Sequence, residues 1–225
     1  MAQADEGRYF LTGIRVVELA DEHGEYCGKL LGGLGADVIK VEPLGGEGTR
    51  AYGPFYQDQP HPNRSLYFWH YNLGKRSVTL DLDDPDGQAD FRRLVATADV
   101  LIDTRSRDYL SDRGLGFEAL RALNPGLIHA RITPFGDDGP WANYRGSDLV
   151  HLALGGMMMN SGYDAEPDGT YTTPPIAPQM WHAYHIAGEL AAFQIMTALH
   201  AKETTGRGQA LSFAVHEAAA KNTEL

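Results

Sequence analysis

The stretch GIRVVELADEHGEYCGKLLGGLGADVIKVE, residues 13–42, contains the pattern that decides the fold. Its two ends, 13–19 and 37–42, are short β-branched runs, and residues 24–36 between them carry apolar side chains at helical spacing. A strand, a helix and a second strand of these lengths form a crossover unit, in which the strands are parallel and the connection is right-handed. The stretch therefore predicts an α/β fold built on a parallel sheet.

The same alternation continues along the chain. Further strands are expected at 76–82, 100–103, 127–133 and 210–215. Helices are expected within 84–98, around 116–123, near 148–158 and from about Trp181 to Lys202. Strands and helices that alternate in this way predict a parallel sheet with helices on both faces.

Charge and composition exclude several classes of function. The chain has 225 residues, and 30 acidic against 19 basic side chains give a formal charge of -11. A protein that binds nucleic acid or an anionic membrane needs a basic face, so we expect neither partner. The N-terminus lacks the pattern of a secretion signal, no apolar run is long enough to span a bilayer, and there is a single cysteine. These features predict a cytoplasmic protein.

Two loop-rich segments, 42–65 and 133–148, follow the ends of expected strands and are dense in glycine, proline and aromatic residues. Ligands of open α/β sheets bind at the carboxyl ends of the strands, so these segments are candidates for a ligand site. Plain surface connections are the alternative. Gly32, Gly33 and Gly35 close the first helix instead of opening it, which argues against a standard dinucleotide site.

The run WHAYHIAGE, residues 181–189, opens the long helix and gathers several polar side chains. His182, His185 and Glu189 share one helical face, a spacing that is compatible with metal ligation but differs from the two-histidine motif of zinc proteases. We therefore predict no metal site, with a metal-dependent hydrolase as an alternative. Cys27 lies in register with leucines of the first helix and is interpreted as a packing residue.

Longer stretches carry a resemblance to a known family. GADVIKVE, GKRSVTLDL, ALNPGLI and TGRGQ occur in this order, and the chain from about residue 11 onward resembles the family III CoA-transferases. This group contains the formyl-CoA and carnitine-CoA transferases and the related alpha-methylacyl-CoA racemase. The resemblance implies a Rossmann-like large domain at 11–225 after a flexible N-terminus at 1–10. It also implies interlocked dimers, and a C-terminal portion of the family that is absent from this chain.

The resemblance further implies an aspartate nucleophile at the start of the helix that precedes TGRGQ. Its carboxylate takes up the acyl group and then CoA, and so moves CoA from an acyl-CoA thioester to a carboxylic acid. Matching back from TGRGQ, and forward from GGMMMNSG, puts this position on Tyr184. A phenol with a pKa of about 10 is a poor nucleophile at neutral pH, so the catalytic group is left open.

No other acidic residue occupies the matching position. Asp148, Asp164, Asp168 and Glu189 are nearby in the sequence and are candidates for a replacement carboxylate. The racemase branch pairs its aspartate with a histidine in a GHD-like motif, whereas the motif here reads GSD with Ser147. The resemblance therefore favours CoA transfer over racemisation.

The resemblance also implies which residues contact CoA. Matching places these positions at Glu22, His23, Leu80, Asp81, Leu82, Asp83, Thr104, Arg105, Gly146, Ser147 and Asp148. Arg105 is the attractive member because a guanidinium at the end of a strand suits a phosphate, with a solvated loop arginine as the alternative. Glu22 and Asp83 place negative charge where an anionic ligand is expected. CoA and its thioesters are expected as substrates, and no permanently bound cofactor is expected.

Two hypotheses follow for the chain. The first is a CoA-transferase that acts on an acyl-CoA and a carboxylic acid, as a homodimer or as a heteromer with a related subunit. The second is a non-catalytic CoA-binding or partner-stabilising subunit, or a truncated relative. Tyr184 and the abrupt end of the chain after 216–225 favour the second hypothesis, whereas the fold signature fits both.

Overall fold

A parallel β-sheet forms the centre of the molecule in the computed structural model, which describes residues 9–223. In chain order its strands are β1 (Arg15–Leu19), β2 (Asp37–Glu42), β3 (Arg76–Thr79), β4 (Val100–Asp103), β5 (Ile128–Thr133) and β6 (Ala210–Ala214). Their order across the sheet is β3-β2-β1-β4-β5-β6, and every neighbouring pair is parallel. This is the Rossmann order, so the expected fold class is confirmed. The predicted strand 76–82 ends earlier than expected, at Thr79.

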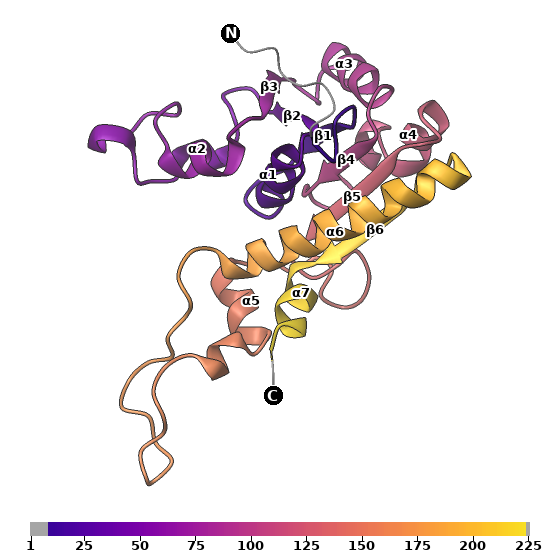
Figure 1. Ribbon diagram of the computed structural model, residues 1–225. Coiled ribbons are helices and arrows are strands. Elements are labelled where there is room, and N and C mark those ends of the chain that lie inside the picture. Colours follow the sequence, from indigo (N-terminus) through magenta and orange to yellow (C-terminus); the bar gives the residue numbers. More distant parts are fainter. Residues whose placement is uncertain (1–8, 224–225) are drawn as a thin grey trace.

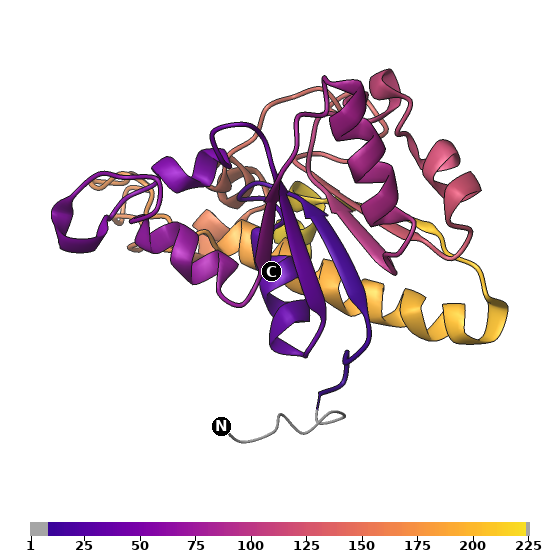
Figure 2. The same cartoon turned by 90° about the horizontal axis from the view of Figure 1, so that it is seen from above.

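Helices cover both faces of this sheet (Figure 1). They are α1 (Glu25–Gly33), α2 (Leu66–Asn72), α3 (Pro85–Val95), α4 (Phe117–Leu123), α5 (Asp148–Leu154), α6 (His182–Thr205) and α7 (Val215–Lys221). Figure 2, which views the molecule from above, shows α3 and α4 on one side of the strands and α6 on the other. Residues 1–8 of the expected flexible N-terminus lie outside the described residues.

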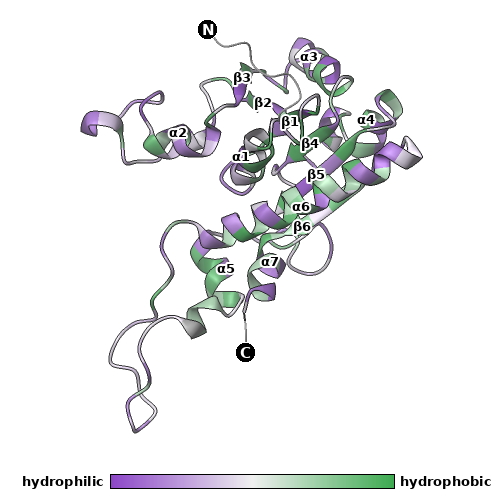
Figure 3. Cartoon of the chain, in the orientation of Figure 1, coloured by the Kyte–Doolittle hydropathy of each residue, from purple (hydrophilic) through white to green (hydrophobic). Residues whose placement is uncertain are grey.

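Two hydrophobic cores result, one on each face of the sheet. Alternate residues of a strand point to opposite faces, so Val16 packs against α1 and α6 while Val17 packs against α3. Figure 3 shows the hydrophobic residues concentrated in the central strands that both cores share. None of the helices within residues 9–223 is long and apolar enough to cross a membrane.

Close packing of α1 against α6 positions the start of α6. A Cβ added at Gly188 of α6 would lie 3.0 Å from the backbone nitrogen of Cys27 in α1, so a side chain at this position would push the two helices apart. Cys27 is fully buried in this contact, and burial raises the pKa of its thiol. Its predicted role as a packing residue is confirmed.

Two segments project from the body of the molecule in both views (Figures 1 and 2). One contains α2, a helix that the sequence patterns did not predict; the side chain of Ser65 caps it by accepting a hydrogen bond from the backbone N–H of Phe68. The other is the long connection 161–181 between α5 and α6. Both lead to the carboxyl ends of the strands, where a ligand is expected.

Candidate functional site

The strand order reverses between β1 and β4, and the loops after these strands are tied together. The backbone N–H of Asp21 donates to the Thr104 hydroxyl at 3.0 Å, and that hydroxyl donates to the Asp21 carboxylate at 2.8 Å. The Asp21 carboxylate also accepts from the ring Nδ1 of His23 at 2.8 Å. A reversal point of this kind is where α/β sheets bind ligands. Two predicted CoA-contact stretches therefore meet at the expected crevice.

These contacts shift the pKa values of the three consecutive residues after β1. Burial alone would raise the pKa of Asp21, but hydrogen bonds from His23 and Thr104 hold it at about 2. Burial would lower the pKa of His23, but its hydrogen bond and charge interaction with Asp21 raise it. Burial and the neighbouring Asp21 charge both raise the pKa of Glu22. Glu22 is therefore the more basic of the two carboxylates.

A third predicted stretch, 146–148, meets the start of α6. Asp148 is buried, and its Oδ1 accepts hydrogen bonds from the backbone N–H groups of Ala183 at 2.8 Å and Tyr184 at 3.4 Å. The Ser147 side chain caps α5 by accepting from the backbone N–H of Val150. This stretch therefore fixes the start of α6, where the sequence analysis expects the nucleophile position of the family.

Tyr184 is enclosed by aromatic rings and only 2% exposed. Its ring stacks on Trp181 at 5.7 Å between centroids and lies 4.7 Å from the ring of His23. Burial, followed by the charges of Glu22 and Asp148, raises the pKa of the phenol. The phenol is therefore protonated at neutral pH, which makes it a poor nucleophile.

The stack continues outward from Tyr184 to the loop after β2. Trp181 lies parallel to Tyr52 with 6.0 Å between centroids, and Tyr67 meets Trp181 edge-on at 5.7 Å. The Tyr52 hydroxyl donates to Oε1 of Glu22 at 3.0 Å. Sequence patterns missed this arrangement, although the density of aromatic residues in 42–65 is the signal that could have pointed to it.

The histidines of WHAYHIAGE do not build a metal site. His185 is hydrogen bonded to the Tyr71 hydroxyl at 2.7 Å, and His182 is exposed. In the part of the chain that the structure describes, His182, His185 and Glu189 do not gather within ligand distance of one another. The group that does gather is Asp21, Glu22 and His23, where the Asp21–His23 hydrogen bond accounts for the approach.

Arg105 follows β4 and forms an ion pair with Glu47. Its Nη2 lies 2.5 Å from Oε2 of Glu47, and its backbone N–H donates to the Asp103 carboxylate at 2.8 Å. The guanidinium is 19% exposed, and its Nε is buried without a hydrogen-bond partner among the described residues. A phosphate could use this guanidinium only by displacing the Glu47 carboxylate.

Residues 80–83 are the remaining stretch that is predicted to contact CoA, and they lie at another part of the sheet. The backbone N–H of Leu80 donates to the carbonyl of Glu42, Leu82 is buried in the core under α3, and Asp83 pairs with Arg113. These contacts link 80–83 to β2 and to the α3–α4 side, whereas His23 and Asp148 contact Tyr184.

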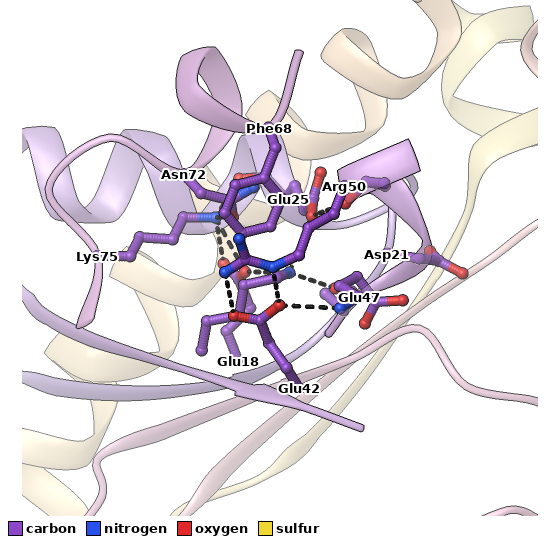
Figure 4. A network of polar contacts seen from close by, with 12 residues as sticks. Glu18, Asp21, Glu25, Glu42, Glu47, Arg50, Phe68, Asn72 and Lys75 are labelled. Atoms are coloured by element: carbon purple, nitrogen blue, oxygen red, sulfur yellow. Dashed lines mark hydrogen bonds and ion pairs between the residues drawn. The ribbon is translucent and has the colours of Figure 1, made fainter. Parts of the chain in front are cut away.

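A buried ionic network lies beside the site, at the carboxyl ends of β1 and β2 (Figure 4). Lys40 contacts Glu18 at 3.2 Å and Glu25 at 2.9 Å, and Lys75 contacts Glu18 at 2.7 Å. In the same network the Arg50 guanidinium pairs with the Glu42 carboxylate. Charges that are buried must be paired, so this network fixes the loops around the site. The sequence analysis did not anticipate it.

A cavity of about 600 Å³ opens next to this network. It is lined by residues 45–48, 50–51 and 60–62 together with Phe55. The predicted ligand segment 42–65 therefore does border a hollow, although Tyr184 is not among the lining residues.

Comparison with known proteins identifies the family. A model of CoA-transferase family III matches residues 11–224. The chain belongs to this family. It is 43% identical over 209 residues to the succinate–glutarate CoA-transferase of Agrobacterium fabrum, which covers 91% of this chain and 50% of the relative. It is 39% identical to subunit BbsE of the succinyl-CoA:(R)-benzylsuccinate CoA-transferase of Thauera aromatica, covering 93% and 50%.

A solved structure gives the same result for the fold. A CAIB/BAIF family protein from Brucella suis superimposes with a TM-score of 0.84 at 37% identity, covering 93% of this chain and 54% of the other. The chain thus spans about half the length of the relatives that it matches. The assignment of 11–225 as the large domain stays a prediction.

Proposed function

We propose that this chain takes part in moving CoA between an acyl-CoA thioester and a carboxylic acid. The observation that carries the proposal is the match to CoA-transferase family III over residues 11–224. Three relatives with 36–43% identity have succinate or succinyl-CoA in their names. Succinyl-CoA or a similar dicarboxylic thioester is therefore the proposed donor.

CoA is proposed to bind along the carboxyl ends of β1 and β4, with the thioester directed toward Tyr184. Support comes from Glu22, His23 and the 146–148 stretch, which surround that residue. Arg105 is proposed to hold a phosphate after Glu47 moves away. Contact of CoA with 80–83, and a cytoplasmic location, remain predictions.

The active form is proposed to be a homodimer or a heteromer with a related subunit. Relatives include BbsE and the beta subunit of a succinyl-CoA–L-malate CoA-transferase from Chloroflexus aurantiacus, both of which are named as subunits.

A second candidate function is a non-catalytic CoA-binding or partner-stabilising subunit. The observation that favours it is Tyr184, a buried and protonated phenol at the position of the family's nucleophile. The two functions predict the same ligand and differ in turnover.

Two measurements on the purified chain test the proposal. Calorimetry with free CoA measures binding, and mass spectrometry follows transfer of CoA from unlabelled succinyl-CoA to ¹³C-labelled succinate or glutarate. Binding with transfer supports the transferase. Binding without transfer supports the non-catalytic subunit, and a folded chain that does neither contradicts both.

A further inference from the structure

We propose that Glu22 is the carboxylate that is acylated in this chain. The inference rests on the proposed CoA transfer, which requires a side chain that can carry first an acyl group and then CoA. Tyr184 cannot do this, because the phenol is protonated and its ester would not take up CoA as an acyl thioester. The reaction therefore needs a carboxylate elsewhere in the same site.

Glu22 is linked to Tyr184 through neighbouring residues on two sides. On one side, the next residue in the chain, His23, packs its ring 4.7 Å from the ring of Tyr184. On the other side, the Tyr52 hydroxyl donates a hydrogen bond to Glu22. The Tyr52 ring lies parallel to the ring of Trp181, which in turn stacks on Tyr184. Two chains of contacts thus connect Glu22 with Tyr184, and the negative charge of Glu22 acts on the phenol of Tyr184.

The other nearby carboxylates are committed to structural contacts. Oδ1 of Asp21 accepts from the backbone and the ring of His23 and from the Thr104 hydroxyl, and its low pKa makes it a weak nucleophile. Asp148 is buried and holds the first N–H groups of α6. In both residues Oδ1 accepts from backbone N–H groups and so fixes the chain around it, which favours a structural role for Asp21 and Asp148.

The candidates named from the sequence are less well placed. Asp164 and Asp168 lie on the exposed 161–181 connection, and Glu189 lies on the exposed side of α6. Glu22 is half-buried, and among the described residues the Tyr52 hydroxyl is the one side-chain group of another residue that hydrogen bonds it. One of its oxygens is thus available for attack while the other is held in position.

The chemistry balances without a further reactant. A Glu22 oxygen attacks the carbonyl carbon of the donor thioester, the C–S bond breaks, and CoA thiolate leaves a mixed anhydride. The thiolate then attacks the glutamyl carbonyl carbon, and the C–O bond breaks to release the donor acid and leave a glutamyl-CoA thioester. An acceptor carboxylate attacks that carbonyl, the C–S bond breaks, and the thiolate leaves a second mixed anhydride. The thiolate then attacks the acceptor's carbonyl carbon, and the C–O bond breaks to give the new acyl-CoA and restore the Glu22 carboxylate.

The experiment is to trap the acylated residue. The chain is incubated with succinyl-CoA, treated with hydroxylamine, digested and examined by mass spectrometry for a hydroxamate, which forms from an acyl-activated carboxylate. Transfer of CoA to labelled succinate is measured in parallel for Glu22→Gln, Glu22→Asp and the control Asp164→Asn. Calorimetry with CoA and circular dichroism show whether each variant is folded and binds.

We expect the hydroxamate on Glu22 and a loss of at least about 10³-fold in transfer for Glu22→Gln. Glu22→Asp keeps the label at position 22 at a lower rate, and Asp164→Asn transfers CoA like the unaltered chain. Transfer that persists in Glu22→Gln, or a hydroxamate on another residue, overturns the inference while the proposed function stands. An unaltered chain that shows neither transfer nor label overturns both.

Discussion

The pairing of Arg105 with Glu47 leads to a prediction about CoA affinity. Substitution Glu47→Gln removes the negative charge that lies 2.5 Å from the guanidinium, in a pair whose members are 19% and 5% exposed. A hydrogen bond between a guanidinium and an anionic group contributes about 1.5–3 kcal/mol. If a phosphate must displace the carboxylate to reach Arg105, the amide of Glu47→Gln competes less strongly than the carboxylate.

We expect Glu47→Gln to lower the Kd for CoA about 10-fold, which corresponds to about 1.4 kcal/mol. The same change leaves a partly buried guanidinium without its counter-charge, so the free energy of unfolding should fall by about 1–3 kcal/mol. Calorimetry with CoA measures the first effect and urea denaturation the second. The variant is thus expected to bind CoA more tightly while its folded state is less stable. A purely structural role of Glu47 would not increase the affinity for CoA.

Two further variants make this test decisive. Arg105→Ala should weaken CoA binding at least about 10-fold, because the guanidinium that receives the phosphate is gone. Glu118→Gln removes one charge from an exposed pair with Arg121 and should leave the Kd unchanged. The reasoning is refuted if Glu47→Gln binds CoA with unchanged or lower affinity while remaining folded.

Three predictions concern stability, each measured by urea denaturation. Gly28→Ala should lower the free energy of unfolding by about 2–4 kcal/mol, because its Cβ would lie 1.7 Å from a carboxylate oxygen of the buried network. The control Gly33→Ala in the same helix meets nothing within 4 Å and should stabilise the fold slightly. Equal effects of the two substitutions would contradict this prediction. Burial lowers the pKa of His151 to about 4, so the unfolded chain takes up a proton as pH falls below 6.5 while the folded chain does not. Between pH 7 and 5 the unaltered chain should therefore lose about 2 kcal/mol more than His151→Gln, and parallel pH profiles would contradict this. Asp148→Ala should lower the free energy of unfolding by about 1–3 kcal/mol, because two N–H groups of α6 lose their acceptor. Asp148→Asn should lower it less, because its amide oxygen can still accept. The reverse order of the two variants would contradict the role of Asp148 as the acceptor.

The sequence predicted the sheet because its signals are local. In 13–42 the β-branched runs and the helical spacing between them are enough to define a crossover unit, and four more strands repeat the pattern. α2 was missed because it is short and aromatic, and its stability comes from the Ser65 cap and from tertiary contacts such as Arg50 on the ring of Phe68. The contact with Arg50 depends on the tertiary fold and leaves no periodic signal in the sequence.

The site was only partly predictable for the same reason. Matching to the family predicted Glu22, His23 and Asp148 as CoA contacts, and in the structure His23 and Asp148 contact Tyr184. Glu47 was not predicted as the partner of Arg105, because the two residues are 58 positions apart and no local rule connects them. Ionic partners of buried groups are determined by the tertiary fold, so a sequence can indicate that an arginine is present but not that it is already paired.

The surroundings of Tyr184 determine how a carboxylate introduced at this position would behave. A carboxylate introduced by Tyr184→Asp would be enclosed by Trp181 and His23 and would lie near the charges of Glu22 and Asp148. Burial and like charges both raise the pKa of a carboxyl group, so this aspartate would ionise poorly next to an intact Glu22. Removing the Glu22 charge relieves part of that repulsion.

Tyr184→Asp is therefore expected to act differently in two backgrounds. Added to Glu22→Gln, it should restore transfer of CoA at least about 10-fold above Glu22→Gln alone, because one carboxylate is again present and its pKa is no longer raised by the other. Added to the unaltered chain, it should give no gain. Hydroxamate mapping of the double variant then finds the label at position 184. A folded, CoA-binding double variant without recovered transfer would contradict the view that positions 22 and 184 serve the same reacting carbonyl.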